Sequence, residues 1–299
     1  MKMNKALLVV LAVMGVSVSG PMVKWSLACG ASPVMIAFGR MLLSGLLLLL
    51  PALRSGELKQ VIRAPKRQVL LACSAGLLLA AHYTAWMTSL SFASTFVSTA
   101  LVCTQPLFVA ALSGLVLKER MPRAAIPGAA VAVIGALLIA LNALLGGVSG
   151  DLTGALLALA GAIMMAGHWL CNRYARRTVE ALPFMVLLYA QTALLLALTL
   201  PFLGGFRMTW MALLAVAGLA VGCTLLGHSM FTLALGKVSA TVVSFAILGE
   251  PVGAMVWSFI MFGEKPPLLV FIGGVVTIAG LALYLMGTSG LLRRRSGNA

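Results

Sequence analysis

Long apolar stretches recur along the whole of this 299-residue chain, with short polar segments between them. A stretch of about twenty apolar residues has the length that crosses the hydrocarbon core of a bilayer as an α-helix. The alternation typical of barrel strands is absent, and a helix satisfies its backbone hydrogen bonds internally. We therefore predict ten membrane-spanning helices, at residues 6–27, 33–52, 68–89, 95–117, 124–142, 153–172, 183–203, 209–235, 240–262 and 267–287.

The second half of the chain repeats the first. Residues 90–138 align with residues 235–283 without a gap, at an offset of 145. The alignment pairs residue types that are not abundant here: Ser94 with Ser239, Pro106 with Pro251, Glu119 with Glu264, Pro122 with Pro267, Gly128 with Gly273 and Gly135 with Gly280. A shared apolar composition does not explain such matches, so the pattern indicates an internal duplication.

Five spans in each copy would invert the second copy in the membrane, because an odd number of crossings reverses its direction. The predicted fold class is an all-α integral membrane protein whose ten transmembrane helices form two inverted five-helix repeats. We place the first repeat at residues 1–146, the second at 147–290 and a basic cytoplasmic tail at 291–299. This design predicts alternating access, with a binding site between the repeats near the middle of the membrane.

The charge distribution predicts an orientation. The chain is 62% hydrophobic and 9% charged, with a formal net charge of +15. With the N-terminus inside, the outer side holds Lys24, Arg207 and Lys265, and Arg40 lies within a span. The remaining basic residues are cytoplasmic: Lys2, Lys5, Arg54, Lys59, Arg63, Lys66, Arg67, Lys118, Arg120, Arg123, Arg173, Arg176, Arg177, Lys237, Arg293, Arg294 and Arg295. This bias predicts a multi-pass protein of the inner (plasma) membrane with both termini cytoplasmic. From the same charge distribution we expect anionic membrane lipids as partners, and we do not expect nucleic acid.

Several features of the chain have structural interpretations. Residues 1–20 resemble a signal peptide, but apolar sequence continues past Gly20, so we expect an uncleaved first helix. The five cysteines lack the spacing of metal ligands, so we predict no metal, no cofactor and no disulfide. Glu119 and Glu264 lie beside basic residues at span ends, where we expect structural ion pairs or helix caps rather than coupling sites. Glycines seven residues apart near the end of each repeat are expected to pack helices, either between the halves or in a homo-oligomer: Gly128, Gly135, Gly273, Gly280 and Gly287.

The doubled motifs carry a family resemblance. The first copy contains "SLSFAS…QPLF…LKER" and the second "LALGKVSA…EPVG…FGEK", after a pattern from Gly15 to Lys24 and Ser32-Pro33 leading to Arg40. In this order, over about residues 7 to 287, the chain resembles the ten-helix EamA-type members of the drug/metabolite transporter superfamily. Met14 stands where that family often has a tryptophan. The resemblance implies secondary transport of small metabolites, commonly the export of amino acids or related solutes.

Glu250 is the leading candidate for a functional residue. It is the one carboxylate near the middle of a predicted span, where a charged side chain costs about 2.5 to 3.5 kcal/mol on insertion scales. The repeat places Gln105 at the matching position, and both precede a proline, which removes a backbone donor. We expect the pair at a binding site between the halves. The alternative is that both hydrogen-bond neighbouring helices as structural links.

Aromatic residues extend this candidate site. Helical spacing places Glu250 and Trp257 on one face of residues 240–262, together with Val243, Ile247 and Ala254. An acid and an aromatic ring along one wall suit a cationic or zwitterionic ligand. The alternative for Trp257 is an anchor at the membrane interface.

The histidines and Arg40 complete the candidate set. His82 and Trp86 share a face of residues 68–89 with Tyr83 adjacent, and His228 lies within residues 209–235. An intramembrane histidine either relays protons and binds substrate, or sits neutral and hydrogen-bonded between helices.

Arg40 corresponds to an arginine that the resemblance places in the second span. It either attracts an anionic group such as a carboxylate or extends toward the interface. His168, near a span end, is expected to be structural.

The sequence thus predicts a secondary active transporter, not an enzyme, that exports a small amphipathic metabolite, an amino acid or related solute, by alternating access. Proton coupling is a further hypothesis, because a carboxylic acid in a medium of low dielectric constant can bind and release a proton. The alternative substrate class is cationic drugs or quaternary amines. An integral-membrane enzyme acting on lipids is disfavoured because the six acidic residues are dispersed. The chain has no nucleotide-binding glycine loop, which argues against ATP-driven transport.

Overall fold

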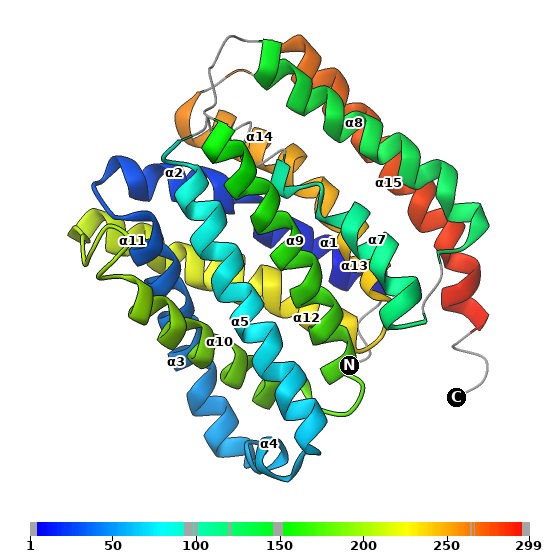
Figure 1. Ribbon diagram of the computed structural model, residues 1–299. Coiled ribbons are helices and arrows are strands. Elements are labelled where there is room, and N and C mark those ends of the chain that lie inside the picture. Colours follow the sequence, from blue (N-terminus) through cyan, green and yellow to red (C-terminus); the bar gives the residue numbers. More distant parts are fainter. Residues whose placement is uncertain are drawn as a thin grey trace.

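The computed structural model describes residues 5–92, 98, 101–118, 121–145, 152–263, 265 and 267–294. The predicted ion pairs of Glu119 and Glu264 lie outside these residues. Over the described residues the protein is helical and contains no strand (Figure 1). Its elements are α1 (Lys5–Ser17), α2 (Ser19–Ala28), α3 (Pro33–Ser55), α4 (Lys59–Arg63), α5 (Lys66–Ser89), α7 (Gln105–Val116), η1 (Arg123–Ala125), α8 (Ile126–Leu145), α9 (Leu152–Ala175), α10 (Ala181–Thr199), α11 (Trp210–Gly218), η2 (Leu219–His228), α12 (Ser229–Leu235), α13 (Ala240–Ala246), η3 (Ile247–Gly249), α14 (Glu250–Phe262) and α15 (Leu268–Arg294).

Most of these helices are long and apolar enough to cross a membrane. Seven meet both conditions: Leu7–Ala28, Pro33–Ser55, Lys66–Ser89, Leu152–Ala175, Ala181–Thr199, Trp210–Leu235 and Ala240–Phe262. Three shorter apolar helices, Gln105–Val116, Arg123–Leu138 and Phe271–Gly287, overlap the other predicted spans. The all-helical membrane fold is confirmed, while the number of ten spans stays a prediction.

Four predicted spans contain an irregular segment within the described residues. The first is divided at Val18, between α1 and α2. The fourth span has a turn at Cys103 and Thr104, directly before Gln105. The eighth widens into the π-helix η2, and the ninth tightens into the 3₁₀ turn η3 directly before Glu250. Uniform helical periodicity does not predict such changes, because they depend on the packing of neighbouring helices.

Glycine allows α1 to approach η2 at backbone distance. A Cβ atom on Gly15 would lie 2.7 Å from the amide nitrogen of Gly227, and one on Gly227 would lie 2.8 Å from that of Val16. Neither position has room for a side chain, so the two backbones are in direct contact.

The helices α8 and α15 lie antiparallel and side by side (Figure 1). Their glycines face the partner backbone: Gly135 contacts Thr277, and Gly280 contacts Ala132. The offset of 145 converts the first of these pairs into the second. Such an exchange of partners is the pattern of a two-fold relation between two copies. These glycines therefore pack the two repeats against each other within one chain.

The same offset relates contacts elsewhere in the fold. Gly161 on α9 packs against the Trp86 Cβ and the His82 carbonyl on α5, while Gly227 packs against Val16. The offset of 145 relates residue 82 to residue 227 and residue 161 to residue 16. The contact between Gly227 and Val16 is therefore the repeat-related counterpart of the contact between His82 and Gly161. On α3, Gly45 faces Ala190 of α10, which is its own counterpart at the offset of 145. The duplication seen in the sequence therefore extends into the packing.

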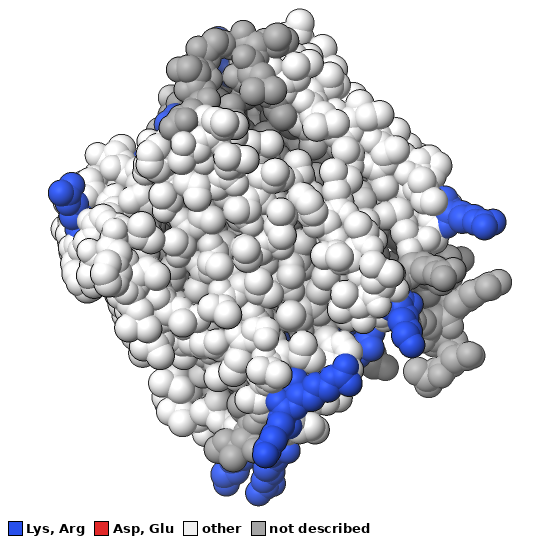
Figure 2. Space-filling view, in the orientation of Figure 1, with Lys and Arg blue, Asp and Glu red and all other residues white. Residues whose placement is uncertain are grey.

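The surface separates charge from apolar side chains. Figure 2 shows Lys and Arg at the margins of the visible face and none across its centre. Large apolar side chains are exposed along the helices, for example Leu115, Leu194 and Met286. Such a belt is what contact with lipid requires, because exposed apolar area on this scale is unfavourable in water.

Candidate functional site

A small cavity lies between the two repeats. Its lining comes from both: Val16, Ser19, Arg40, His82, Tyr83, Trp86, Val102, Cys103 and Gln105 from the first, and Met165, His228, Phe231, Ile247 and Glu250 from the second. Its volume is about 30 Å³, which holds a few water molecules but not an amino acid. A solute of that size would therefore need the lining side chains or helices to move apart.

Arg40 is held inside the protein. It lies on α3, is 1% exposed, and does not extend toward the interface. Its Nε donates to the Thr224 hydroxyl at 2.7 Å and its Nη1 to the Ser19 hydroxyl at 3.2 Å. The guanidinium carbon lies 5.2 Å from the centre of the Tyr83 ring. The remaining nitrogen, Nη2, is buried without a hydrogen-bond partner among the described residues.

Two further hydrogen-bond donors at the cavity are also buried without a described partner. The Tyr83 hydroxyl and the Trp86 indole nitrogen are buried and have no partner among the residues that the structure describes. Buried polar groups in native proteins are almost always hydrogen-bonded, so an unpaired set needs an explanation. Together with Arg40, these residues present three unpaired polar groups beside one cavity. An anionic or strongly accepting ligand would satisfy them.

His82 presents an acceptor to the cavity in its neutral form. Its Nδ1 lies 2.9 Å from the carbonyl oxygen of Gly161 on α9. Because a carbonyl only accepts, Nδ1 carries the proton, and Nε2 then has a lone pair. His168, also buried, makes the corresponding bond in the opposite direction, from α9 to the Ala75 carbonyl of α5 at 2.9 Å. The two histidines therefore also link α5 to α9.

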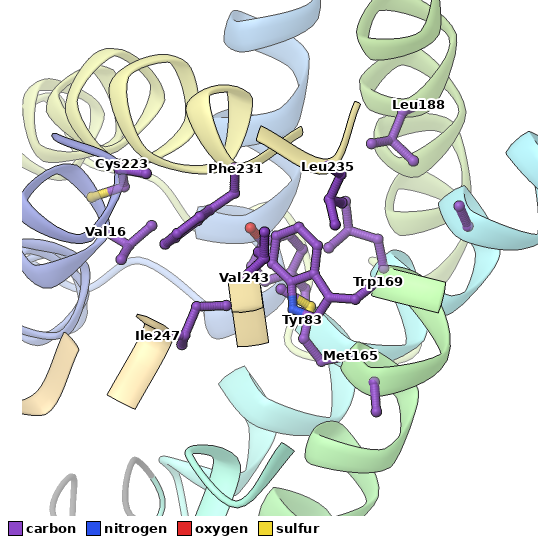
Figure 3. Close-up of a cluster of buried hydrophobic side chains, with 14 of the residues drawn as sticks. Val16, Tyr83, Met165, Trp169, Leu188, Cys223, Phe231, Leu235, Val243 and Ile247 are labelled. Carbon is purple, nitrogen blue, oxygen red and sulfur yellow. The ribbon is translucent and has the colours of Figure 1, made fainter. Parts of the chain in front are cut away.

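His228 is the last residue of η2 and lies between aromatic rings. The indole of Trp169 stacks on it at 5.8 Å with an angle of 12° between the planes. The Tyr83 ring is 6.4 Å away on α5. Figure 3 shows Trp169, Tyr83, Met165 and Phe231 in the buried cluster beside the cavity.

Gln105 is oriented by Trp169. The indole nitrogen donates to Gln105 Oε1 at 3.1 Å. An indole N–H only donates, so the acceptor must be the amide oxygen, and this assigns the amide group. The NH₂ group of Gln105 is therefore available as a donor at the cavity.

Glu250 begins α14, directly after the 3₁₀ turn η3. It is partly buried and lines the cavity. Among the described residues it makes no hydrogen bond or ion pair, although Arg40 interacts with it electrostatically across the site. The N-terminal end of a helix favours a negative charge. The cavity therefore has a carboxyl group on one repeat and a guanidinium group on the other.

The structure brings together seven of the eight predicted site residues. Trp257 is the exception: it is partly buried on α14 but does not line the cavity. Glu250 and Trp257 lie on the same uninterrupted helix, but seven residues separate them by about 10 Å along its axis, so Trp257 lies beyond the small cavity. Residues at the cavity that sequence reasoning missed are Val16, Ser19, Val102, Cys103, Met165 and Phe231. Ser19 could have been identified from the sequence, because it is a hydroxyl-bearing residue within an apolar span. No group of three potential ligands suitable for a metal occurs in the described part of the chain.

A membrane fold built twice from the same set of helices, with a polar cavity between the copies, defines the class of multi-pass membrane transporters. Comparison with known families identifies one that matches both halves of the chain. The family model "EamA-like transporter family" matches residues 3–141 and again residues 152–286. The chain belongs to this family, within the drug/metabolite transporter superfamily, and is a transporter rather than an enzyme.

Two curated proteins and one solved structure are similar. The "Probable terminal-alkyne amino-acid exporter" of Streptantibioticus cattleyicolor is 30% identical over 200 residues, which are 66% of either chain. The "Uncharacterized transporter YdfC" of Bacillus subtilis is 27% identical over 187 residues, 62% of this chain and 60% of that protein. Both matches span less than two thirds of the relative's length. A structure titled "Crystal structure of protein" superposes with a TM-score of 0.78 at 17% identity, covering 96% of this chain and 99% of the other, which supports the fold alone.

Proposed function

We propose that the protein exports a small amphipathic amino acid or a closely related zwitterion, and that the cavity between the repeats is its binding site. The observation that carries this proposal is the pair of opposite charges at the cavity, with Arg40 Nη2 unpaired and Glu250 free of hydrogen bonds among the described residues. A zwitterion would place its carboxylate against Arg40 and its ammonium against Glu250. The amide NH₂ of Gln105 would donate a second hydrogen bond to the carboxylate.

The apolar side chains at the cavity fit the rest of such a solute. Val16, Met165, Phe231 and Ile247 surround the charged groups. Methionine and aromatic side chains adapt to varied apolar shapes. One relative is named as an amino-acid exporter, which agrees with this substrate class.

The transport cycle that we propose uses ten spans in two inverted five-helix repeats, residues 1–146 and 147–290, followed by a tail at residues 291–299. The exchanged contacts at the offset of 145 support the two-fold relation. We place the protein in the inner (plasma) membrane with both termini cytoplasmic, and membrane lipids around its apolar belt. One chain supplies both sides of the cavity, so the proposal does not require a homo-oligomer.

Proton coupling through Glu250 is part of the proposal. A carboxyl group that binds the ammonium in one state could exchange it for a proton in the other. A second candidate function, the efflux of quaternary amines, is favoured by Glu250 and the aromatic rings but gives Arg40 no role.

The test is ligand binding by the purified protein, measured as the shift of its unfolding temperature. Leucine is compared with 3-methylbutylamine, which lacks the carboxylate, and with 4-methylpentanoate, which lacks the ammonium. Methionine, phenylalanine, choline, uridine and glucose complete the panel. We expect amino acids to stabilise the protein more than either half-molecule does. Stabilisation by choline and the amine alone would establish the second candidate function instead.

A further inference from the structure

We propose that Thr224, which does not line the cavity, is a positioning residue that holds the Arg40 guanidinium in place for the substrate carboxylate. This inference rests on the proposed function, because it assigns a task to Arg40. Thr224 is fully buried in η2, in the second repeat, whereas Arg40 lies on α3 in the first. The bond between them at 2.7 Å therefore joins the two repeats beside the cavity.

The Arg40 side chain is fixed at three points. Thr224 accepts from Nε, Ser19 accepts from Nη1, and the Tyr83 ring lies against the guanidinium face. A guanidinium group is planar, so fixing two of its nitrogens determines the direction of the third. The third nitrogen, Nη2, is the one without a partner. Thr224 thus helps to set the direction in which that N–H group points.

The π-helix explains why the Thr224 hydroxyl is suited to this role. Arg40 Nε only donates, so Thr224 Oγ1 must accept and direct its own proton elsewhere. The acceptor is the Leu219 carbonyl at 3.4 Å, five residues earlier, which is the spacing of a π-helix. In an ordinary α-helix the acceptor would be the carbonyl of residue 220 or 221.

The carbonyl of Ala220 is instead used by α3. The Ser44 hydroxyl, which donates to the Arg40 carbonyl at 2.7 Å, also lies 3.3 Å from the Ala220 carbonyl oxygen. Two links therefore join α3 to η2, with the same spacing of four residues on each helix: Arg40 to Thr224, and Ser44 to Ala220. The wide helix both positions the acceptor for Arg40 and supports it with a second contact.

The experiment compares three variants with the wild-type protein in detergent. Thr224→Val removes the hydroxyl and keeps the side-chain shape, while Thr224→Ser keeps the hydroxyl. The matched control is Thr232→Val, since Thr232 is 2% exposed in the same run of helix, and its hydroxyl accepts from Asn172 at 3.2 Å rather than from a cavity residue. The readout is the ratio of the Kd for 3-methylbutylamine to the Kd for leucine. This ratio reports recognition of the carboxylate and is insensitive to a general loss of stability.

We expect Thr224→Val to lower this ratio about tenfold, the size of one hydrogen bond to a charged group, with the amine affinity unchanged. Thr224→Ser and Thr232→Val should keep the wild-type ratio. An unchanged ratio in Thr224→Val, with a wild-type protein that prefers leucine, would overturn this inference and leave the proposed function intact. A wild-type protein that does not prefer leucine would overturn both. If Thr224→Val does not fold, Thr224→Ala removes the same acceptor with a smaller side chain, and an unchanged ratio there would likewise reject the inference.

Discussion

At the scale of single residues, the site is defined by groups whose hydrogen-bonding capacity is not used up within the protein. Arg40, Tyr83 and Trp86 each have a buried polar atom without a described partner. Buried atoms without a described partner also occur away from the cavity, at Asn172, Gln191 and Tyr284, whereas His168 bonds the Ala75 carbonyl. What distinguishes Arg40, Tyr83 and Trp86 is that their unpaired atoms belong to residues lining one cavity, whereas His168 links two helices. His82 belongs to both groups, because one of its nitrogens links α5 to α9 and the residue lines the cavity.

Glu250→Gln tests the partner of the substrate ammonium. The change removes the charge and keeps the shape, so the preference for leucine over 4-methylpentanoate should fall about tenfold, by the loss of a charged hydrogen bond. Coupling to a pH gradient in proteoliposomes should disappear with the carboxyl group. Trp257→Phe is the control, since Trp257 lies on the same helix without lining the cavity and its replacement should leave pH-gradient coupling in place. Full pH-driven transport by Glu250→Gln would exclude it as the coupling residue.

Trp169→Phe tests the orientation of Gln105. The variant keeps an aromatic ring against His228 but loses the N–H that donates to Gln105 Oε1. The amide can then turn its oxygen toward the cavity, which repels a carboxylate. We expect a several-fold weaker leucine affinity, in line with about 1 kcal/mol for one hydrogen bond, while the amine affinity is kept. Equal losses for both ligands, measured by the same unfolding-temperature assay, would point to a change in packing instead.

Many of the cavity residues could be predicted from sequence for a simple reason. Ionisable and large polar side chains are rare in membrane spans, so Glu250, Gln105, His82 and Arg40 were conspicuous. Trp169 and Thr224 were not, because their roles depend on which helix lies opposite. Trp257 does not line the cavity because helical spacing predicts a shared face but not how far along the helix a cavity extends.

At the scale of elements, the irregular segments gather at the cavity. The break between α1 and α2 precedes Ser19, η2 contains Thr224 and His228, and η3 leads into Glu250. Departures from regular helix commonly occur where side chains or backbone groups must be re-aimed. Hydrophobic periodicity predicted the spans that contain them but not the departures. The Pro251 that follows Glu250 gave a partial signal, because proline at the second position favours a helix start.

The contact between α1 and η2 gives a test at this scale. Gly15→Ala would place a methyl group against the backbone of Gly227, which does not give way easily. We expect a loss of about 1 to 3 kcal/mol of stability, typical of overpacking, seen as a lower unfolding temperature in detergent. Gly20→Ala is the matched control, because a Cβ atom there meets nothing within 4 Å. Equal unfolding temperatures for the two variants would show that α1 and η2 are not in close contact.

At the scale of the whole molecule, the duplication organises the fold. Contacts exchange partners at the offset of 145 between α8 and α15, and Gly45 faces its own counterpart on α10. A relation of this kind allows two states in which the repeats exchange conformations, one open to each side of the membrane. This exchange is the basis of alternating access. The sequence predicted the duplication because proline, glycine and glutamate matched at one offset. It did not predict how small the cavity is, because cavity size depends on how the side chains of the two repeats pack.

The proposed orientation can be tested with single cysteines, in a background where the five native cysteines are replaced by serine. Ser55→Cys lies in the exposed end of α3, and Phe206→Cys lies in the exposed segment between α10 and α11. A membrane-impermeant maleimide added to intact cells should label position 206 and leave position 55 unlabelled until the cells are opened. Labelling of position 55 alone in intact cells would indicate the opposite orientation, and labelling of both positions would contradict an odd number of spans between them.

The most direct test of the central claim is solute counterflow of leucine in proteoliposomes that contain the wild-type protein. A carrier with a zwitterion site between its repeats predicts transient, saturable accumulation of labelled leucine that is driven by unlabelled leucine inside. This accumulation should be suppressed by excess external methionine and unaffected by glucose. Flux that rises linearly with concentration, or no counterflow with any amino acid of the panel, would contradict the account.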